Sequence, residues 1–163
     1  MRNSDMFLCG NIPHNKLLGI RMRSMEKLVS LHKHWINADA LKQVVAMKVA
    51  GDSNLPEQIR NLAEMHSSFT RLSVLYGLIY VVIEGYKELK IDNPKVDMLL
   101  AKEEFVDALR LFRNATFHYQ KKAISEKAMK FLELEESENW ISELHLSFKL
   151  FFEDVLPIRE MVE

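Results

Sequence analysis

One segment of the sequence combines a permanently charged side chain with one that can transfer a proton near neutral pH. Arg113 is followed directly by Asn114 and, at position 118, by a histidine. An arginine offers a planar charged fork that stabilises developing negative charge, and a histidine can give or take a proton at physiological pH. The segment therefore predicts charge stabilisation combined with acid–base catalysis by Arg113 and His118. Asn114 is available to orient a bound phosphate or the imidazole.

A similar arrangement occurs a second time, because Arg60 and Asn61 are followed by His66, which lies six positions after the arginine instead of five. Spacing alone therefore does not choose between the two sites. Local charge favours the later one, where six basic residues face a single acid, Glu126, over residues 110–130 (Arg110, Arg113, Lys121, Lys122, Lys127, Lys130). Such a surface attracts phosphate, and we expect Arg110, Lys121 and Lys122 to bind the phosphates of a nucleic acid.

Other chemistries lack their residues in this sequence. It contains no GxxxxGK loop, no GxGxxG after a strand and no HExxH, and no glutamate stands three residues before a histidine. Cys9 is the only cysteine, so a CxxC site is excluded, and His32 and His34 would point about 200° apart on a helix. We expect no metal and no cofactor. A metal site built from histidines of several helices remains the remoter alternative.

Composition predicts one helical domain. The chain has 163 residues, a formal charge of -1, 48% hydrophobic residues, and only 5 glycines and 4 prolines. Few turn-forming residues argue against a β-sandwich, and the balanced charge excludes a general affinity for nucleic acid or anionic lipid. No signal peptide is predicted, and the uncharged run of residues 72–83 is too short for a membrane span. We therefore expect a cytoplasmic protein with an N-terminal tail at 1–15 and a helical domain at 16–163.

The hydrophobic pattern predicts about five or six helices. Met25, Val29 and Ile36 mark the apolar face of a first helix over residues 17–36, with a possible break at 37–39. Pro56 opens a second helix. Its seam runs through Ile59, Leu62, His66, Phe69, Ser73, Tyr76, Tyr80 and Ile83. The second helix is apolar all round from Leu72 to Ile83, so that segment should be the central core element.

Four shorter stretches complete the predicted bundle. A short helix follows the connection at 89–95, and another has the core stripe Phe105, Leu109, Phe112, Thr116 and Tyr119. Ser125 is a plausible N-cap for the next helix, and the last long helix ends before Pro157. No strand alternation and no internal repeat is present, which favours an all-α bundle.

Helix geometry separates the two arginine–histidine matches. If Phe112 is set at 0°, Asn114 and His118 lie at about 200° and 240° and therefore point away from the core stripe. His66 lies within a predicted core seam, so the second match is the one expected to meet a substrate. Leu111 and Ala115 share the outer face with His118, and such an apolar strip calls for a cover, which a second copy of the chain could supply.

Residues 72–122, with the segment LRLFRNATFHYQKK, resemble the C-terminal half of the HEPN domain family. That family of small helical bundles is marked by an arginine, a polar residue directly after it, and a histidine four to six residues further on. The resemblance implies a dimeric, metal-independent endoribonuclease of the toxin or defence type. In this sequence Arg113, Asn114 and His118 would be its catalytic residues. It also makes an antitoxin protein a possible partner.

The chemistry of RNA suits these residues. The RNA 2′-hydroxyl can attack the adjacent phosphate if one group takes its proton, another protonates the leaving oxygen and a cation stabilises the phosphorus centre. One histidine supplies only one of the two proton transfers, and a two-fold dimer would supply the second. Single-stranded RNA is the expected substrate, because pairing holds the hydroxyl out of line.

A non-catalytic interaction module is the alternative, since some members of the family look like scaffolds. Glu84 ends the apolar run at 72–83 and needs a partner if it is buried, for which an arginine is the natural candidate. In this alternative Arg113 pairs with Glu84, and His118 caps or clamps the end of its helix.

Overall fold

The protein is an all-α bundle. The computed structural model describes residues 14–48, 54–121 and 125–156, with side chains described from Ser24 onward. Within those ranges it contains six helices and no strand, as the sequence predicts. The helices are α1 (His14–Val45), α2 (Glu57–Leu89), α3 (Pro94–Leu100), α4 (Glu103–Phe117), α5 (Glu126–Leu132) and α6 (Ser137–Val155).

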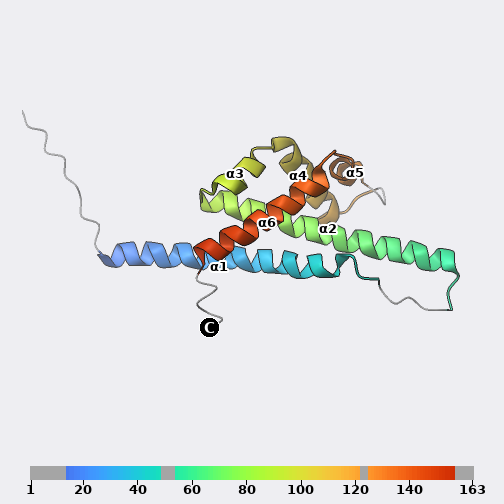
Figure 1. Cartoon of the computed structure of the whole chain (residues 1–163), viewed down its shortest axis with the longest axis horizontal. Coiled ribbons are helices and arrows are strands. Elements are labelled where there is room, and N and C mark those ends of the chain that lie inside the picture. The colour runs from blue at the N-terminus through green and yellow to red at the C-terminus, as the bar shows by residue number, and fades with distance from the viewer. Residues whose placement is uncertain (1–13, 49–53, 122–124, 157–163) are drawn as a thin grey trace, which may run out of the picture.

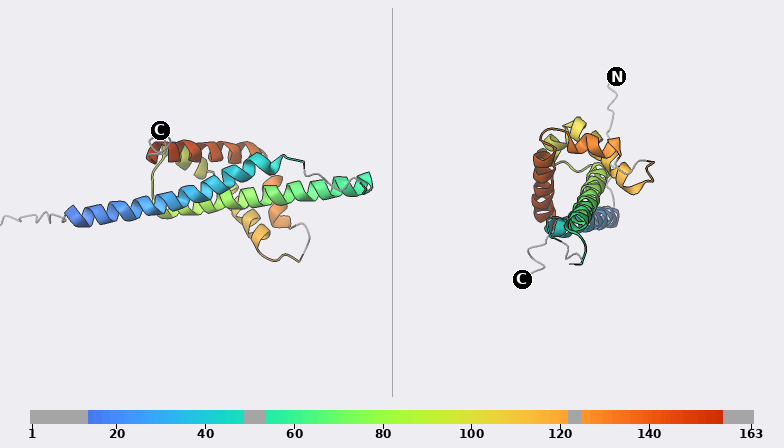
Figure 2. Two further views of the ribbon diagram at one scale, coloured as in Figure 1. Left: turned by 90° about the horizontal axis from the view of Figure 1, so that it is seen from below. Right: turned by 90° about the vertical axis from the view of Figure 1, so that its right-hand side faces the viewer.

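Two long helices form the frame on which the shorter ones pack. Figure 1 shows α1 and α2 side by side and running in opposite directions, with α3 to α6 gathered on one side of the pair. The N-terminal ends of α1 and α2 extend past the shorter helices at opposite ends of the molecule (Figures 1 and 2). The 33 residues of α2 correspond to a rod about 50 Å long, so one helix serves both as core and as projection.

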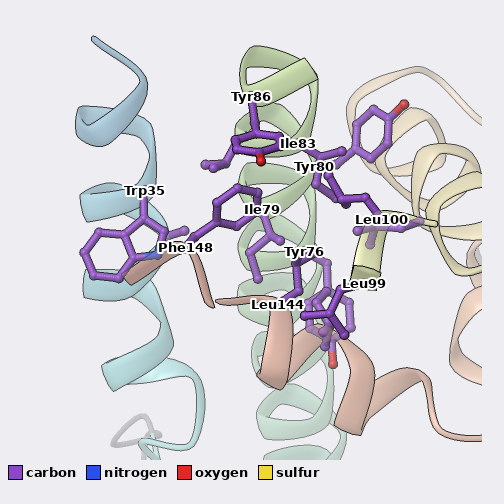
Figure 3. Close-up of a cluster of buried hydrophobic side chains, with 14 of the residues drawn as sticks. Trp35, Tyr76, Ile79, Tyr80, Ile83, Tyr86, Leu99, Leu100, Leu144 and Phe148 are labelled. Carbon is purple, nitrogen blue, oxygen red and sulfur yellow. The ribbon is translucent and has the colours of Figure 1, made fainter. Parts of the chain in front are cut away.

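The C-terminal half of α2 is the centre of the core, as predicted from its lack of a polar face. Val82 and Ile83 are fully buried, and Ile79 is 3% exposed. Figure 3 shows the side chains of α2 in the middle of the cluster, with Phe148 of α6 and Trp35 of α1 on one flank. Apolar area removed from water in this way contributes about 25 cal/mol per Å², so burial of this segment stabilises the fold.

The starts of three helices follow the local rules for helix N-termini. Pro56 precedes the first residue of α2, as predicted, and Asn93 caps α3 by accepting hydrogen bonds from the backbone N–H groups of Lys95 and Val96. Ser125 caps α5, also as predicted, and its hydroxyl accepts from Lys127 N. Each cap satisfies backbone groups that a helix end leaves unpaired.

The apolar face assigned to α1 from the sequence is wrong. Met25, Val29 and Ile36 are 43%, 52% and 47% exposed. The buried face of α1 is a neighbouring stripe of the same helix. It consists of Leu28, Leu31, Trp35 and Ala38. Gly85 suits this register, because a Cβ there would overlap the end of the Leu31 side chain, so the glycine lets α1 approach α2 closely along that line. The predicted break at 37–39 is also absent, since α1 continues to Val45.

The first half of α2 also differs from the prediction, which placed its apolar seam in the core. Ile59, Leu62 and His66 are exposed rather than buried. The reason is the end of α1, which Arg71 fixes by donating hydrogen bonds to the carbonyl groups of Val45 and Met47. A cation at this end of α1 also complements the helix dipole. On the N-terminal side of Arg71, α2 extends past the other helices (Figure 1), and residues 57–63 are exposed while Ser67, Ser68 and Phe69 are half-buried.

Among the described helices, α2 alone is long and apolar enough to meet the simple criteria for a membrane span. The criteria use length and composition only, and 44% of the apolar window in α2 is buried inside the bundle. A buried core helix meets the same criteria, which is the simpler account of this one.

A buried histidine joins α1 to α6. The Nε2 atom of His145 lies 2.9 Å from Asp39 Oδ1, the ring stacks on Trp35, and the Trp35 indole N–H donates to the His145 carbonyl group. An ionised carboxylate only accepts, so Nε2 carries the ring proton and Nδ1 is left as a buried atom without a hydrogen-bond partner. Protonating Nδ1 would bury an unpaired donor, and burial accordingly lowers the pKa of His145 against the opposing effect of Asp39.

This arrangement predicts that the protein loses stability on acidification. The native state resists protonation of His145, whereas the unfolded chain takes up the proton near the ordinary histidine value of 6.5. Stability is therefore greatest above pH 6.5 and falls below it. The slope contributed by this group is no more than about 1.4 kcal/mol per pH unit. Burial lowers the pKa of His32, which also packs on Trp35, so His32 adds a slope of the same sign.

Urea unfolding at pH 7.5, 6.5 and 5.5 measures this slope. His145→Gln keeps a donor for Asp39 but cannot titrate, so it should flatten the loss of unfolding free energy below pH 6.5. His34→Gln, at an exposed position on α1, is the matched control and should leave the slope as in the wild type. Equal slopes in wild type and His145→Gln would contradict the assignment.

Candidate functional site

The arginine and histidine predicted to carry chemistry lie at the C-terminal end of α4. This helix ends at Phe117, and His118 takes an extended backbone conformation while its N–H donates to Asn114 O at 3.1 Å. The Phe117 ring covers Gly77 of α2 so closely that a Cβ at position 77 would overlap it. A glycine inside an apolar helix is the sequence signal for such an approach, and the contact packs the last residue of α4 against α2.

Arg113 is held between its own helix and α2. Its Nη1 donates to Asn114 Oδ1 at 3.1 Å, and its Nη2 lies 3.7 Å from Glu84 Oε2. The Nε atom is buried without a hydrogen-bond partner. The side chain of Arg113 is 29% exposed, so the guanidinium is oriented from two sides and still reachable from solvent.

The Asn114 side chain therefore contacts the guanidinium of Arg113. The sequence left open whether its amide would orient a phosphate or the imidazole, and the structure shows it instead accepting a hydrogen bond from Arg113. An arginine held by a neighbouring amide keeps its planar fork in one orientation, which suits recognition of a phosphate or carboxylate.

His118 stands apart from this group. The side chain is exposed, and its backbone carbonyl accepts a hydrogen bond from the Gln120 side chain at 3.0 Å. Gln120 was not singled out from the sequence, where nothing distinguishes it from other polar loop residues. Its bond fixes the chain directly after His118, so the histidine leaves the helix on a defined path.

Tyr119 was predicted on the core stripe of this helix, and that prediction is wrong. The residue is 91% exposed, because α4 has already ended and the helical period no longer applies to it. Phe105 and Thr116 are half-buried, while Leu109 and Phe112 are fully buried as expected.

The outer strip of α4 is less open than predicted. Leu111 and Ala115 are both half-buried, and Ala115 packs against the core. The reason is that α4 lies between α2 and α5, so it buries more than one face. Of the strip expected to face a second copy, His118 is the exposed member.

Charge around the site is positive on balance, with one acid beside each of its two arginines, Glu84 at Arg113 and Asp107 at Arg110. Arg110 is exposed and pairs with Asp107 at 3.3 Å, and Lys121 is exposed. Lys122, also predicted to bind phosphate, lies outside the described residues. Tyr80 lies beneath these groups. Burial and then Glu84 raise its pKa, while Arg110 and Arg113 oppose the shift.

The competing match at Arg60 and His66 is not excluded by burial. His66 is exposed, whereas a place in the core was predicted for it, because this part of α2 projects beyond the bundle. What separates the two matches is the surrounding structure. Arg113 is oriented by Asn114 and Glu84, and the residues near it are basic.

An open groove of about 330 Å³ runs between α1 and α2 beside the site. Lys27 and His34 line it from α1, and Glu84 and Glu88 from α2. Glu84 thus borders the groove and also contacts Arg113. Among the described residues, no three His, Cys, Asp or Glu side chains are grouped so that they could hold a metal ion.

The chain finds no match among protein-family models, curated proteins or solved structures.

Because Phe112 is buried and Tyr119 is exposed, truncating these two aromatic side chains should change the free energy of unfolding by very different amounts. Phe112 is fully buried, so Phe112→Ala should lower the free energy of unfolding by about 3–5 kcal/mol. Tyr119→Ala removes a side chain that lies in water and should change it by less than about 0.5 kcal/mol. Urea unfolding monitored by circular dichroism compares the two. A large loss in Tyr119→Ala would mean that the helix continues past Phe117 as first predicted.

The pair formed by Arg113 and Glu84 should contribute little to stability. Both side chains are partly exposed, and such pairs typically contribute about 0.2–1 kcal/mol. A double-mutant cycle with Arg113→Gln and Glu84→Gln measures the coupling. A coupling energy well above 1 kcal/mol would show that Arg113 is chiefly a structural residue.

Proposed function

We propose that the protein is a metal-independent endoribonuclease of the HEPN toxin or defence type, acting on single-stranded RNA as a homodimer. The observation that supports it best is the setting of Arg113, whose guanidinium is oriented by Asn114 on a basic helix end, with the exposed His118 next in the chain. The resemblance of residues 72–122 to the HEPN family supports the same proposal. We also propose that the protein is cytoplasmic, because cellular RNA is accessible to it there.

The proposed reaction uses the RNA itself as nucleophile. His118 takes the 2′-hydroxyl proton or donates a proton to the leaving 5′-oxygen, and Arg113 stabilises the charge that develops on the phosphoryl oxygens. The products are a 2′,3′-cyclic phosphate and a 5′-hydroxyl end. Asn114 acts as a positioning residue, because its amide accepts from Arg113. Arg110 and Lys121 bind neighbouring phosphates.

A second copy completes the site in this proposal. In-line transfer needs base and acid on opposite sides of the phosphorus, and one chain provides one histidine at the site. A two-fold axis beside the exposed His118 would bring two copies of the motif to one phosphate. An antitoxin protein, if the chain has one, would act by covering this face.

A non-catalytic interaction module is the second candidate, and two observations favour it. Arg113 already has an acidic partner in Glu84. Apolar side chains are also exposed along α1 and on the projecting half of α2, among them Val29, Ile59 and Leu62. Surfaces of this kind serve binding to other proteins.

Cleavage of an unstructured RNA with chelator present tests the proposal. His118→Ala and Arg113→Ala should each lower the rate by at least 100-fold, because removal of one group that stabilises transition-state charge or transfers a proton typically costs that much. Asn114→Ala should cost less. Far-ultraviolet circular dichroism confirms that each variant folds.

The other arginine–histidine match provides a control. Arg60→Ala and His66→Ala change the same residue types on an exposed helix and should cleave as fast as the wild type. Equal activity in every variant would show that the cleavage comes from a contaminant, and an inactive wild type would favour the interaction module.

The proposed homodimer is tested separately, by the mass of the protein in solution. Sedimentation at a concentration well above that of the cleavage assay should give twice the monomer mass, and cleavage should rise with protein concentration as the dimer forms. A monomer that cleaves RNA at full rate would contradict the shared site.

A further inference from the structure

Tyr119 is the most exposed large apolar side chain of the described residues, at 91%. It lies directly after His118 and beyond the last residue of α4. Its neighbour Phe117 is 51% exposed but has a structural role, because its ring covers Gly77. Tyr119 has no such role among the described residues: it is not part of the core cluster and has no ring contact with another side chain.

The path of the chain fixes where Tyr119 can act. The Gln120 side chain donates to the His118 carbonyl group at 3.0 Å, and its carbonyl oxygen is 3.4 Å from the Ser125 hydroxyl. These two bonds tie the segment on either side of Tyr119 to itself and to the start of α5. The phenol ring lies in solvent, one residue after the side chain proposed to move the proton.

The segment that carries the ring is basic, although two of its cations have acidic partners: Arg110 pairs with Asp107, and Arg113 lies 3.7 Å from Glu84. Residues 108–121 contain three basic residues, Arg110, Arg113 and Lys121, and no acidic one. An aromatic ring among cations matches the two parts of a single-stranded nucleic acid, whose phosphates bind the cations while an unpaired base stacks on the ring. A duplex offers the phosphates but keeps its bases stacked on each other.

We propose that Tyr119 stacks on an unpaired base next to the phosphate held by Arg113, and so selects single-stranded RNA. This inference rests on the proposed function and adds a preference in binding to the in-line geometry that already favours unpaired RNA in the reaction. Stacking uses the face of the base and therefore tolerates any sequence, so the preference is for unpaired nucleotides and not for one base.

Binding of an uncleavable oligonucleotide tests the inference apart from catalysis. The probe is a fluorescein-labelled, unstructured 12-mer with 2′-deoxyribose throughout, which offers bases and phosphates but no nucleophile. Fluorescence anisotropy should show that Tyr119→Ala weakens binding by about 5- to 150-fold, the range expected for the loss of one stacked base. Tyr119→Phe and Tyr119→Trp keep a ring and should bind as the wild type does.

Two controls separate stacking from other effects. Met98→Ala removes another exposed apolar side chain, 63% exposed on α3, and should leave the affinity unchanged. A blunt duplex of the same length should bind through its phosphates alone, with equal affinity for wild type and Tyr119→Ala. On cleavable RNA, Tyr119→Ala should raise KM more than it lowers kcat.

The outcomes distinguish the inference from the function on which it rests. Equal 12-mer binding by wild type and Tyr119→Ala, beside cleavage that still needs His118, would overturn the stacking role alone. An equal loss in Tyr119→Phe and Tyr119→Ala would also overturn it, because the hydroxyl and not the ring would then be responsible. A wild type that neither binds the 12-mer nor cleaves RNA would remove both, and Tyr119 would then be a contact for another protein.

Discussion

The structure depends on one constraint, which is that the segment Leu72–Ile83 of α2 has no polar face and must be covered on every side. Val82 and Ile83 are fully buried, and α1, α4 and the shorter helices are arranged around them. The constraint reaches the candidate site through Gly77. A Cβ at position 77 would overlap the Phe117 ring, so the glycine leaves room for this last residue of α4 to pack on α2. His118 therefore directly follows a residue that packs on the central helix.

The fold could be predicted where one local signal had no competitor. Pro56, Ser125 and the apolar run of α2 were such signals, and the helices they predicted are present. The buried face of α1 could not be predicted in this way. Val29 and Leu31 lie on two stripes of similar hydrophobicity, and the choice between them depends on the space that Gly85 leaves across the interface. Such complementarity exists only between helices, so no periodicity within one helix reveals it.

At the candidate site too, the sequence predicts the residue types but not the contacts between elements. The sequence supplied the residue types at 113, 114 and 118 and their charge environment. It did not supply the hydrogen bond that turns Asn114 toward Arg113, because either of two side-chain orientations fits the spacing. The exposure of His66 was missed because the seam of α2 continues unbroken in sequence past the point where α1 ends. The exposure of Tyr119 was missed for a related reason, since a helical period was extended beyond the last helical residue.

The projecting half of α2 has a consequence for dynamics. Amide hydrogen exchange reports the free energy of local opening, which falls from the value for global unfolding in a buried element to near zero in an uncovered one. Residues 57–70 and the segment around Ile83 belong to the same helix, yet only the second is enclosed by neighbouring helices. Exchange along α2 should therefore slow steeply across Arg71, which holds the end of α1 against the helix. A single continuous helix would then contain two cooperative units, with the boundary between them set by one arginine.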